Sequence, residues 1–126
     1  MRAVDTNVLV RLVVRDDQKQ VETAQAFVSK GVWVSHVVLA ETSWVLQSAF
    51  KLNHEMIALA IEIFLNHSQV TIQDADVVEA ALENFRKQPA VSFPDNLIVE
   101  IARKAGHLPV GTFDHDLGKL DGTQRL

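Results

Sequence analysis

Short runs rich in β-branched residues alternate with amphipathic helical patterns along the whole chain, and this alternation is the strongest constraint on the fold. Strands separated by helices favour a mainly parallel sheet that helices cover on both faces. We therefore predict an α/β fold, a three-layer α/β/α sandwich with a mainly parallel four- to five-stranded sheet. The expected strands are 2–4, 32–35, 70–72 and 109–112, with room for a short edge strand in the tail. The expected helices are 8–14, 17–30, 36–52, 56–66, 75–87 and 93–105.

Asp5 stands where the first strand passes into the first helix. Arg2 to Val4 form the strand, and an apolar helical run follows from Val8 to Val14. We expect Thr6 or Asn7 to cap that helix, because a short polar side chain accepts the free N–H groups of a first turn. Asp5 then lies at the carboxyl end of a central strand, the edge where open α/β sheets bind ligands. Taken alone, a plain turn role for Asp5 is equally compatible with the sequence.

Size and composition describe one ordinary globular domain, residues 1–126, with 48% hydrophobic and 22% charged residues. The formal net charge of -4 argues against a protein that coats nucleic acid, but not against an enzyme that acts on it. The absence of cysteine fits a reducing cytoplasm. Asp5 and Arg11 interrupt the first apolar run, and no run approaches the ~20 apolar residues of a membrane span. We therefore expect a cytoplasmic protein.

Four acidic residues stand at comparable positions of the predicted fold. Asp5 ends the first strand, Asp95 lies in the first turn of its helix, and Asp114 follows the fourth strand within two residues. Glu41 lies on the helix 36–52 among apolar residues that predict a buried face. Right-handed crossovers bring successive strand ends to one edge of a sheet, so we expect the four side chains to converge there.

Each acid also has a purely structural interpretation. Glu41 would be a half-exposed helix residue and Asp114 part of a turn. Asp95 would form a capping-box-like pair with Ser92. The set of four is harder to explain in this way, because two carboxylates roughly 4 Å apart repel by about 4 kcal/mol at an effective dielectric of about 20. Such a cluster needs protons or cations.

The four acids make an all-oxygen ligand set. Oxygen ligands without histidine or cysteine suit Mg²⁺ or Mn²⁺ rather than zinc. Such a site polarises a phosphate and activates a water for in-line attack, and its fullest version holds two ions roughly 3.5–4 Å apart. Thr6, Asn7 and Thr112 are the natural residues to orient the carboxylates or a bound water.

Four motifs carry a resemblance to a known family. They are Val-Asp-Thr-Asn around Asp5, Leu-Ala-Glu-Thr around Glu41, Phe-Pro-Asp-Asn-Leu-Ile around Asp95 and Thr-Phe-Asp-His-Asp around Asp114. In this order and at this spacing they resemble the PIN-domain ribonucleases, and most closely the VapC-type toxins of bacterial toxin–antitoxin pairs. The resemblance covers the whole chain. Each motif is weak alone, whereas the set of four is fairly specific.

This resemblance implies a PIN-like sandwich, Mg²⁺- or Mn²⁺-dependent hydrolysis of RNA by an endoribonuclease, and inhibition by a cognate antitoxin. A segment of that antitoxin would lie across the active-site groove near Arg11 and Arg15. It also implies that the four acids are catalytic and hold the metal, with Asp116 as a frequent fifth ligand. Ser92 departs from the pattern, since many relatives carry an acid at that position. The departure puts a second metal position in doubt more than the fold.

Residues outside this cluster suggest protein or RNA partners. Arg11 and Arg15 lie on the helix after Asp5, where they can meet RNA phosphates or antitoxin acids, although solvated surface charge is the simpler interpretation. The helices 36–52 and 56–66 carry more apolar residues than one buried face requires, which predicts a homodimer rather than a thick monomeric core. These apolar residues are Val37, Leu39, Trp44, Leu46, Phe50, Ile57, Ile61, Phe64 and Leu65.

Three other protein classes are weaker matches. A phosphatase of the haloacid dehalogenase type also has an acid after its first strand, but it requires a second acid at the position where this chain has Asn7. A receiver domain needs an acid after its central strand, where none comes before Asp74, and a lysine directly after Thr112, where none stands. A PIN-like binding module without activity is the non-enzyme alternative. The intact acids argue against that module, and Ser92 argues mildly for it.

Overall fold

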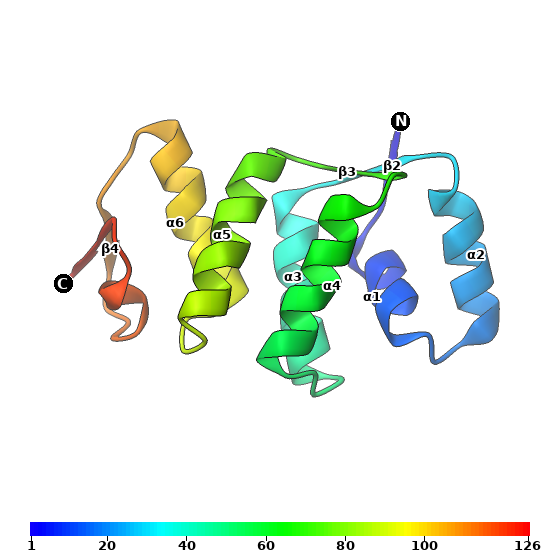
Figure 1. Ribbon diagram of the computed structural model, residues 1–126, viewed down its shortest axis with the longest axis horizontal. Coiled ribbons are helices and arrows are strands. Elements are labelled where there is room, and N and C mark those ends of the chain that lie inside the picture. Colours follow the sequence, from blue (N-terminus) through cyan, green and yellow to red (C-terminus); the bar gives the residue numbers. More distant parts are fainter. The chain divides into compact units, whose positions relative to one another are not determined.

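The computed structural model describes all residues, 1–126. The chain forms two compact units, Met1–Ala75 and Asp76–Leu126 (Figure 1). No helix combines the length and the apolar composition that a membrane-spanning segment needs.

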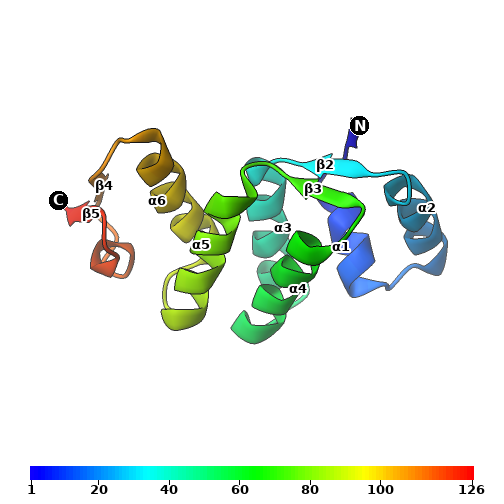
Figure 2. The ribbon, with the colours of Figure 1, turned by 45° about the horizontal axis from the view of Figure 1, so that its top comes forward.

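The first unit contains three parallel strands and four helices. Its sheet has the strand order β1-β2-β3, with Arg2 opposite Val32 and Val32 opposite Val70. Figure 2 shows β2 and β3 side by side on one side of α3 and α4. The elements are β1 (Arg2–Ala3), α1 (Thr6–Val14), α2 (Gln18–Val28), β2 (Val32–Val34), α3 (His36–Ser48), α4 (His54–Asn66) and β3 (Val70–Ile72).

The core of the first unit lies where α1, α3 and α4 meet the inner face of the strands. Leu9 on α1 and Leu39 on α3 are fully buried, and Val34 on β2 is buried with them. Burial of such side chains stabilises the unit by about 1.5–3 kcal/mol each. This core fixes α1 against α3, and α1 begins at Thr6, shortly after β1 ends.

The second unit pairs two helices with a small parallel sheet. Phe85 and Phe93 meet edge to face, with ring centroids 6.1 Å apart, and join the two helices. Gly106 ends α6 in the left-handed conformation, with φ 83°, which glycine adopts without strain. The elements are α5 (Ala75–Lys87), α6 (Phe93–Ala105), β4 (Val110–Thr112), the 3-10 helix η1 (Leu117–Lys119) and β5 (Thr123–Arg125).

The α/β class and the parallel strands agree with the sequence prediction, and the tail does add a strand, β5. The five strands are divided between a three-stranded and a two-stranded sheet, whereas the sequence predicted one sheet. The cap predicted for α1 is wrong, because Asp5 occupies the N-cap position and the helix already begins at Thr6. Helix α3 ends at Ser48, not Leu52, and Asn53 then caps α4 through the N–H of Met56.

Candidate functional site

The predicted acids fall on both units. Asp5 and Glu41 belong to the first unit, and Asp95, Asp114 and Asp116 belong to the second. In each unit, acids form hydrogen bonds with hydroxyl residues of the same unit: Glu41 with Thr6, Asp95 with Ser92, and Asp114 with Thr112. Within each unit, no three His, Asp or Glu side chains gather closely enough to hold a metal ion. The convergence of all four acids therefore stays a prediction.

Asp5 sits at the N-cap of α1 but does not cap the helix with its side chain. Its backbone is extended, as an N-cap requires, and its exposed carboxylate makes no cap hydrogen bond. An Asp in this position usually accepts an N–H of the first turn. The carboxylate of Asp5 is thus left available to a ligand.

Thr6 links the start of α1 to Glu41 on α3. Its side chain is only 7% exposed, and its hydroxyl donates a hydrogen bond to Oε1 of Glu41. This bond restrains Glu41 on the helix face next to the end of β1. Asn7, the third polar residue of this turn, is exposed.

Within the first unit, the face of α3 that carries Glu41 is not the face that packs into the core. Val37 and Trp44, one turn before and after Glu41, are 77% and 63% exposed. The side of α3 that packs into the core carries Leu39 and Leu46 instead. Glu41 is an exposed carboxylate with one buried hydrogen-bond partner, between two exposed apolar side chains.

Asp95 and Asp114 interact within the second unit. Burial raises the pKa of the half-buried Asp95 above its ordinary value, and the nearby carboxylate of Asp114 raises it further. A hydrogen bond with the Ser92 side chain lowers the pKa of Asp95 and offsets part of this effect. A cation bound next to Asp95 would favour its charged form and so oppose both effects.

Ser92 and Asn96 hold the turn that presents Asp95. Ser92 caps α6, since its Oγ accepts the N–H of Asp95 at 3.2 Å. Asn96 is 1% exposed, and its Nδ2 donates to the carbonyl oxygens of Val91 at 3.3 Å and Ser92 at 3.0 Å. Asn96 was not predicted from the sequence as a site residue. Its position, next to Asp95 and on the buried side of α6, could have indicated a role for this polar residue.

Asp114 is held by the loop that follows β4. Its backbone N–H donates to Thr112 Oγ1 at 2.9 Å, and its Oδ1 accepts the N–H of Leu117 at 2.8 Å. One carboxylate oxygen therefore has a turn-capping role, as the structural interpretation of this acid predicted. Asp116 is half-buried and lies 3.7 Å from the amine of Lys119. Thr112 thus orients the backbone of Asp114 rather than its carboxylate.

The residues present fit a hard divalent cation. Their side chains offer carboxylate and hydroxyl oxygens as ligands, which Mg²⁺ and Mn²⁺ prefer, and a cation would offset the effect of Asp114 on the charge of Asp95. No cysteine is present to favour a softer metal.

Arg11 and Arg15 differ in their surroundings. Arg11 is ion-paired with Asp16 at 2.5 Å, and its guanidinium lies 5.6 Å from the centre of the Phe50 ring. Arg15 ends α1 in the left-handed conformation and lines an apolar groove in the same unit. Arg15 is thus the more accessible cation of the two for a partner.

Comparison with known proteins identifies the family. The sequence profile of the PIN domain matches residues 2–123. The chain belongs to the PIN domain family. This assignment agrees with the order of motifs around the four acids. It also excludes the haloacid dehalogenase and receiver alternatives, because these are different families.

Among solved structures, the chain resembles VapC20 of Mycobacterium tuberculosis, described as a Sarcin-Ricin loop cleaving toxin. The sequences are 24% identical, the match covers 94% of this chain and 93% of VapC20, and the TM-score is 0.45. No curated protein matches the chain significantly.

Proposed function

We propose that this PIN-domain protein is an Mg²⁺- or Mn²⁺-dependent endoribonuclease that acts as the toxin of a toxin–antitoxin pair. The observation that carries the proposal is the PIN profile match over residues 2–123, which spans every candidate acid. The VapC-type assignment rests on the four sequence motifs. A catalytically impaired PIN-like binding module is the alternative, because Ser92 replaces an acid that many relatives carry.

In this proposal, Asp5, Asp95 and Asp114 would hold the metal directly, and Glu41 would complete the site directly or through water. The bound ion would activate a water and stabilise the charge that develops on an RNA phosphodiester. The chain's own residues position these ligands: Thr6 orients Glu41 through its hydroxyl, and Ser92 fixes the turn of Asp95. Asp116 is the candidate fifth ligand, and it would have to leave the amine of Lys119.

The test is cleavage of total RNA with Mg²⁺, with Mn²⁺ and with excess EDTA. Asp5→Asn should be nearly inactive yet folded, because Asp5 is exposed and forms no cap hydrogen bond that the fold would lose. Asp121→Asn is the matched control, since it removes one charge from a fully exposed side chain. Full activity in EDTA or in folded Asp5→Asn would refute the proposed mechanism, and an inactive wild type would favour the binding module.

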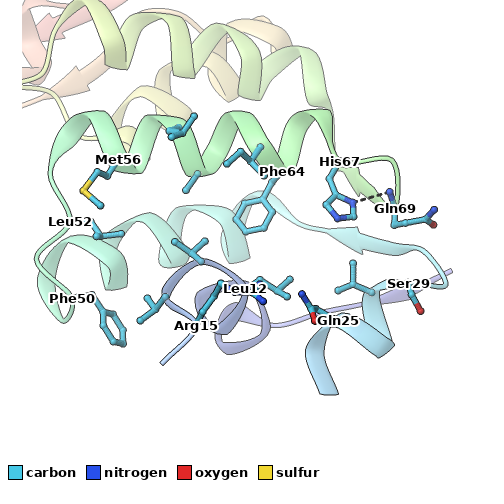
Figure 3. Close-up of a pocket in the computed structure, with 16 residues that line it drawn as sticks. Leu12, Arg15, Gln25, Ser29, Phe50, Leu52, Met56, Phe64, His67 and Gln69 are labelled. Atoms are coloured by element: carbon cyan, nitrogen blue, oxygen red, sulfur yellow. Dashed lines mark hydrogen bonds between the residues drawn. The ribbon is translucent and has the colours of Figure 1, made fainter. Parts of the chain in front are cut away.

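We further propose that the antitoxin binds the apolar groove in the first unit, which has a volume of about 930 Å³. Helices α1, α2 and α4 supply the walls, and Figure 3 shows Leu12, Phe50 and Phe64 among the lining residues. Arg15 contributes a cation to the lining. This lining suits an amphipathic helix that places apolar side chains in the groove and an acid against Arg15.

Ile63 and Ile98 provide a matched pair for this test. Both are about half exposed, at 53% and 49%, but only Ile63 lines the groove. Ile63→Glu should abolish binding of the cognate antitoxin, because it places a charge in the apolar contact. Ile98→Glu should leave binding unchanged. Equal affinity of the two variants would place the antitoxin elsewhere.

We also propose a homodimer, in line with the sequence prediction. Part of the predicted apolar set proves to be core, since Leu39, Leu46 and Ile57 are buried. Val37 and Trp44, which belong to the same predicted set, are exposed in this chain. Light scattering should give twice the 14.0 kDa chain mass. A 14.0 kDa species at tens of micromolar would exclude the dimer.

A further inference from the structure

Arg125 and His115 form a pair beside Asp114 that the four acidic motifs do not explain. Nη1 of Arg125 lies 2.9 Å from Nδ1 of His115. A guanidinium has only donors, so Arg125 donates and the Nδ1 lone pair accepts. A neutral imidazole then carries its proton on the other nitrogen, Nε2. The contact with Arg125 therefore selects the tautomer in which His115 offers an Nε2–H donor.

The pair lies at the same end of the small sheet as Asp114. Arg125 on β5 is the register partner of Thr112 on β4, and Asp114 follows Thr112 by two residues. Both side chains belong to exposed residues. The structure gives the guanidinium of Arg125 only His115 as a hydrogen-bond partner and no carboxylate. Most of its five N–H donors are thus free for a ligand.

Gly118 provides the space that lets Arg125 reach His115. A Cβ at position 118 would lie 2.1 Å from Cγ of Arg125 and 2.6 Å from its Cδ. The stem of Arg125 therefore crosses directly over the bare Cα of Gly118. A methyl group at this position would displace Arg125 without changing any charge.

We propose that Arg125 and His115 bind one phosphate of the RNA strand, next to the phosphate that is cleaved at Asp114. This inference rests on the proposed ribonuclease function. A phosphate offers several acceptor oxygens to the free guanidinium N–H groups and to the Nε2–H of His115. The cation also offsets the repulsion between RNA and the acids Asp114 and Asp116 at this end of the sheet. Arg125 and His115 thus set the register of the strand without taking part in the chemistry.

Salt dependence of RNA binding tests the proposal. Affinity for a fluorescein-labelled single-stranded RNA is measured by anisotropy in Mg²⁺ over a series of KCl concentrations, with Asp5→Asn as the background. Arg125→Gln should weaken binding about tenfold. It should also reduce the slope of log affinity against log salt by about 0.7, the change expected for one lost phosphate contact to a single strand.

Two variants separate this contact from a general loss of charge or structure. Gly118→Ala keeps the charge and should reproduce most of the effect of Arg125→Gln, because it moves the guanidinium. Lys87→Gln removes one charge from a lysine that is paired with Glu83 on α5, and it should leave the slope unchanged. His115→Asn keeps an acceptor for Arg125 but lacks the Nε2–H, and it should weaken binding without changing the slope.

The outcomes distinguish this inference from the proposed function. If the wild type cleaves RNA but Arg125→Gln and Lys87→Gln have equal slopes, the phosphate contact is overturned and the ribonuclease stands. The contact is also overturned if Gly118→Ala binds RNA as tightly as the Asp5→Asn background does. It is overturned as well if Arg125→Gln weakens binding of an acidic peptide but not of RNA. A wild type that neither binds nor cleaves RNA refutes the proposed function, and this inference with it.

Discussion

The hydrogen bond from Thr6 to Glu41 allows stability and catalysis to be separated at one residue. Thr6→Val replaces the hydroxyl with a methyl group of similar size and so removes the bond to Glu41. Thr6→Ser keeps the hydroxyl and removes only the methyl group. The two variants therefore differ chiefly in whether Glu41 keeps its partner.

Both variants should lose similar amounts of stability. Glu41 is exposed, so water replaces the lost donor, and Thr6→Val should lower the free energy of unfolding by about 1 kcal/mol. Thr6 is 7% exposed, so removal of its buried methyl in Thr6→Ser should also cost about 1 kcal/mol. For a chain of 126 residues this corresponds to a decrease in Tm of roughly 3–5 °C.

Catalysis should respond differently. Loss of a hydrogen bond that orients a metal-site carboxylate typically costs about 10- to 100-fold in metal affinity or activity. Thr6→Val should therefore lose about that much kcat/KM in Mg²⁺, whereas Thr6→Ser should retain activity close to the wild type. Cleavage rates are compared at a temperature well below both Tm values, so that the folded fractions are equal.

Two results would refute this reasoning. Wild-type kcat/KM in Thr6→Val would show that the orientation of Glu41 is irrelevant to the reaction. Equal losses in Thr6→Val and Thr6→Ser would show that the buried methyl, not the hydroxyl, matters at this position.

Three further predictions concern the second unit. Ser92→Ala should lower the free energy of unfolding in urea by about 1 kcal/mol, because α6 loses its cap; an unchanged value would show that the cap is redundant. Because burial and Asp114 raise the pKa of Asp95, its ionisation destabilises the folded protein as the pH rises through that pKa. Asp95→Asn should thus have a higher free energy of unfolding than the wild type at pH 7 in metal-free buffer. This difference should vanish as the pH falls below the ordinary pKa of Asp. A difference that does not change with pH would contradict the prediction. Thr112→Val should cost about 1 kcal/mol, because the N–H of Asp114 loses its acceptor, as thermal unfolding would show.

Strand–helix alternation was enough to predict most elements of this fold. The periods of 2 and 3.6 residues report which faces are apolar, and β2, β3, α5 and α6 follow them closely. The end of α3 was missed, because the apolar pattern continues to Leu52 while Lys51 takes a left-handed φ of 57°. Such a stop depends on backbone geometry that the apolar pattern does not report.

The surroundings of the acids were predicted less well than the acids themselves. Apolar neighbours suggested a buried face for Glu41, but periodicity cannot tell which of two apolar stripes on α3 packs inward. The N-cap of α1 was predicted at Thr6 or Asn7 but lies at Asp5, although Asp is itself a favoured N-cap residue. The contact between His115 and Arg125 joins residues from different elements of the chain, so no local pattern reports it.

Binding of Mn²⁺ to the folded protein tests the central claim, that one metal site uses acids from both Asp5 and Asp95. Affinity is measured by the electron paramagnetic resonance signal of free Mn²⁺ for the wild type, Asp5→Asn, Asp95→Asn and the double variant. Ligands of one ion couple, so each single variant should lose most of the affinity and the double variant should lose little more. Wild-type affinity in Asp5→Asn, or fully additive losses in the double variant, would contradict a shared site.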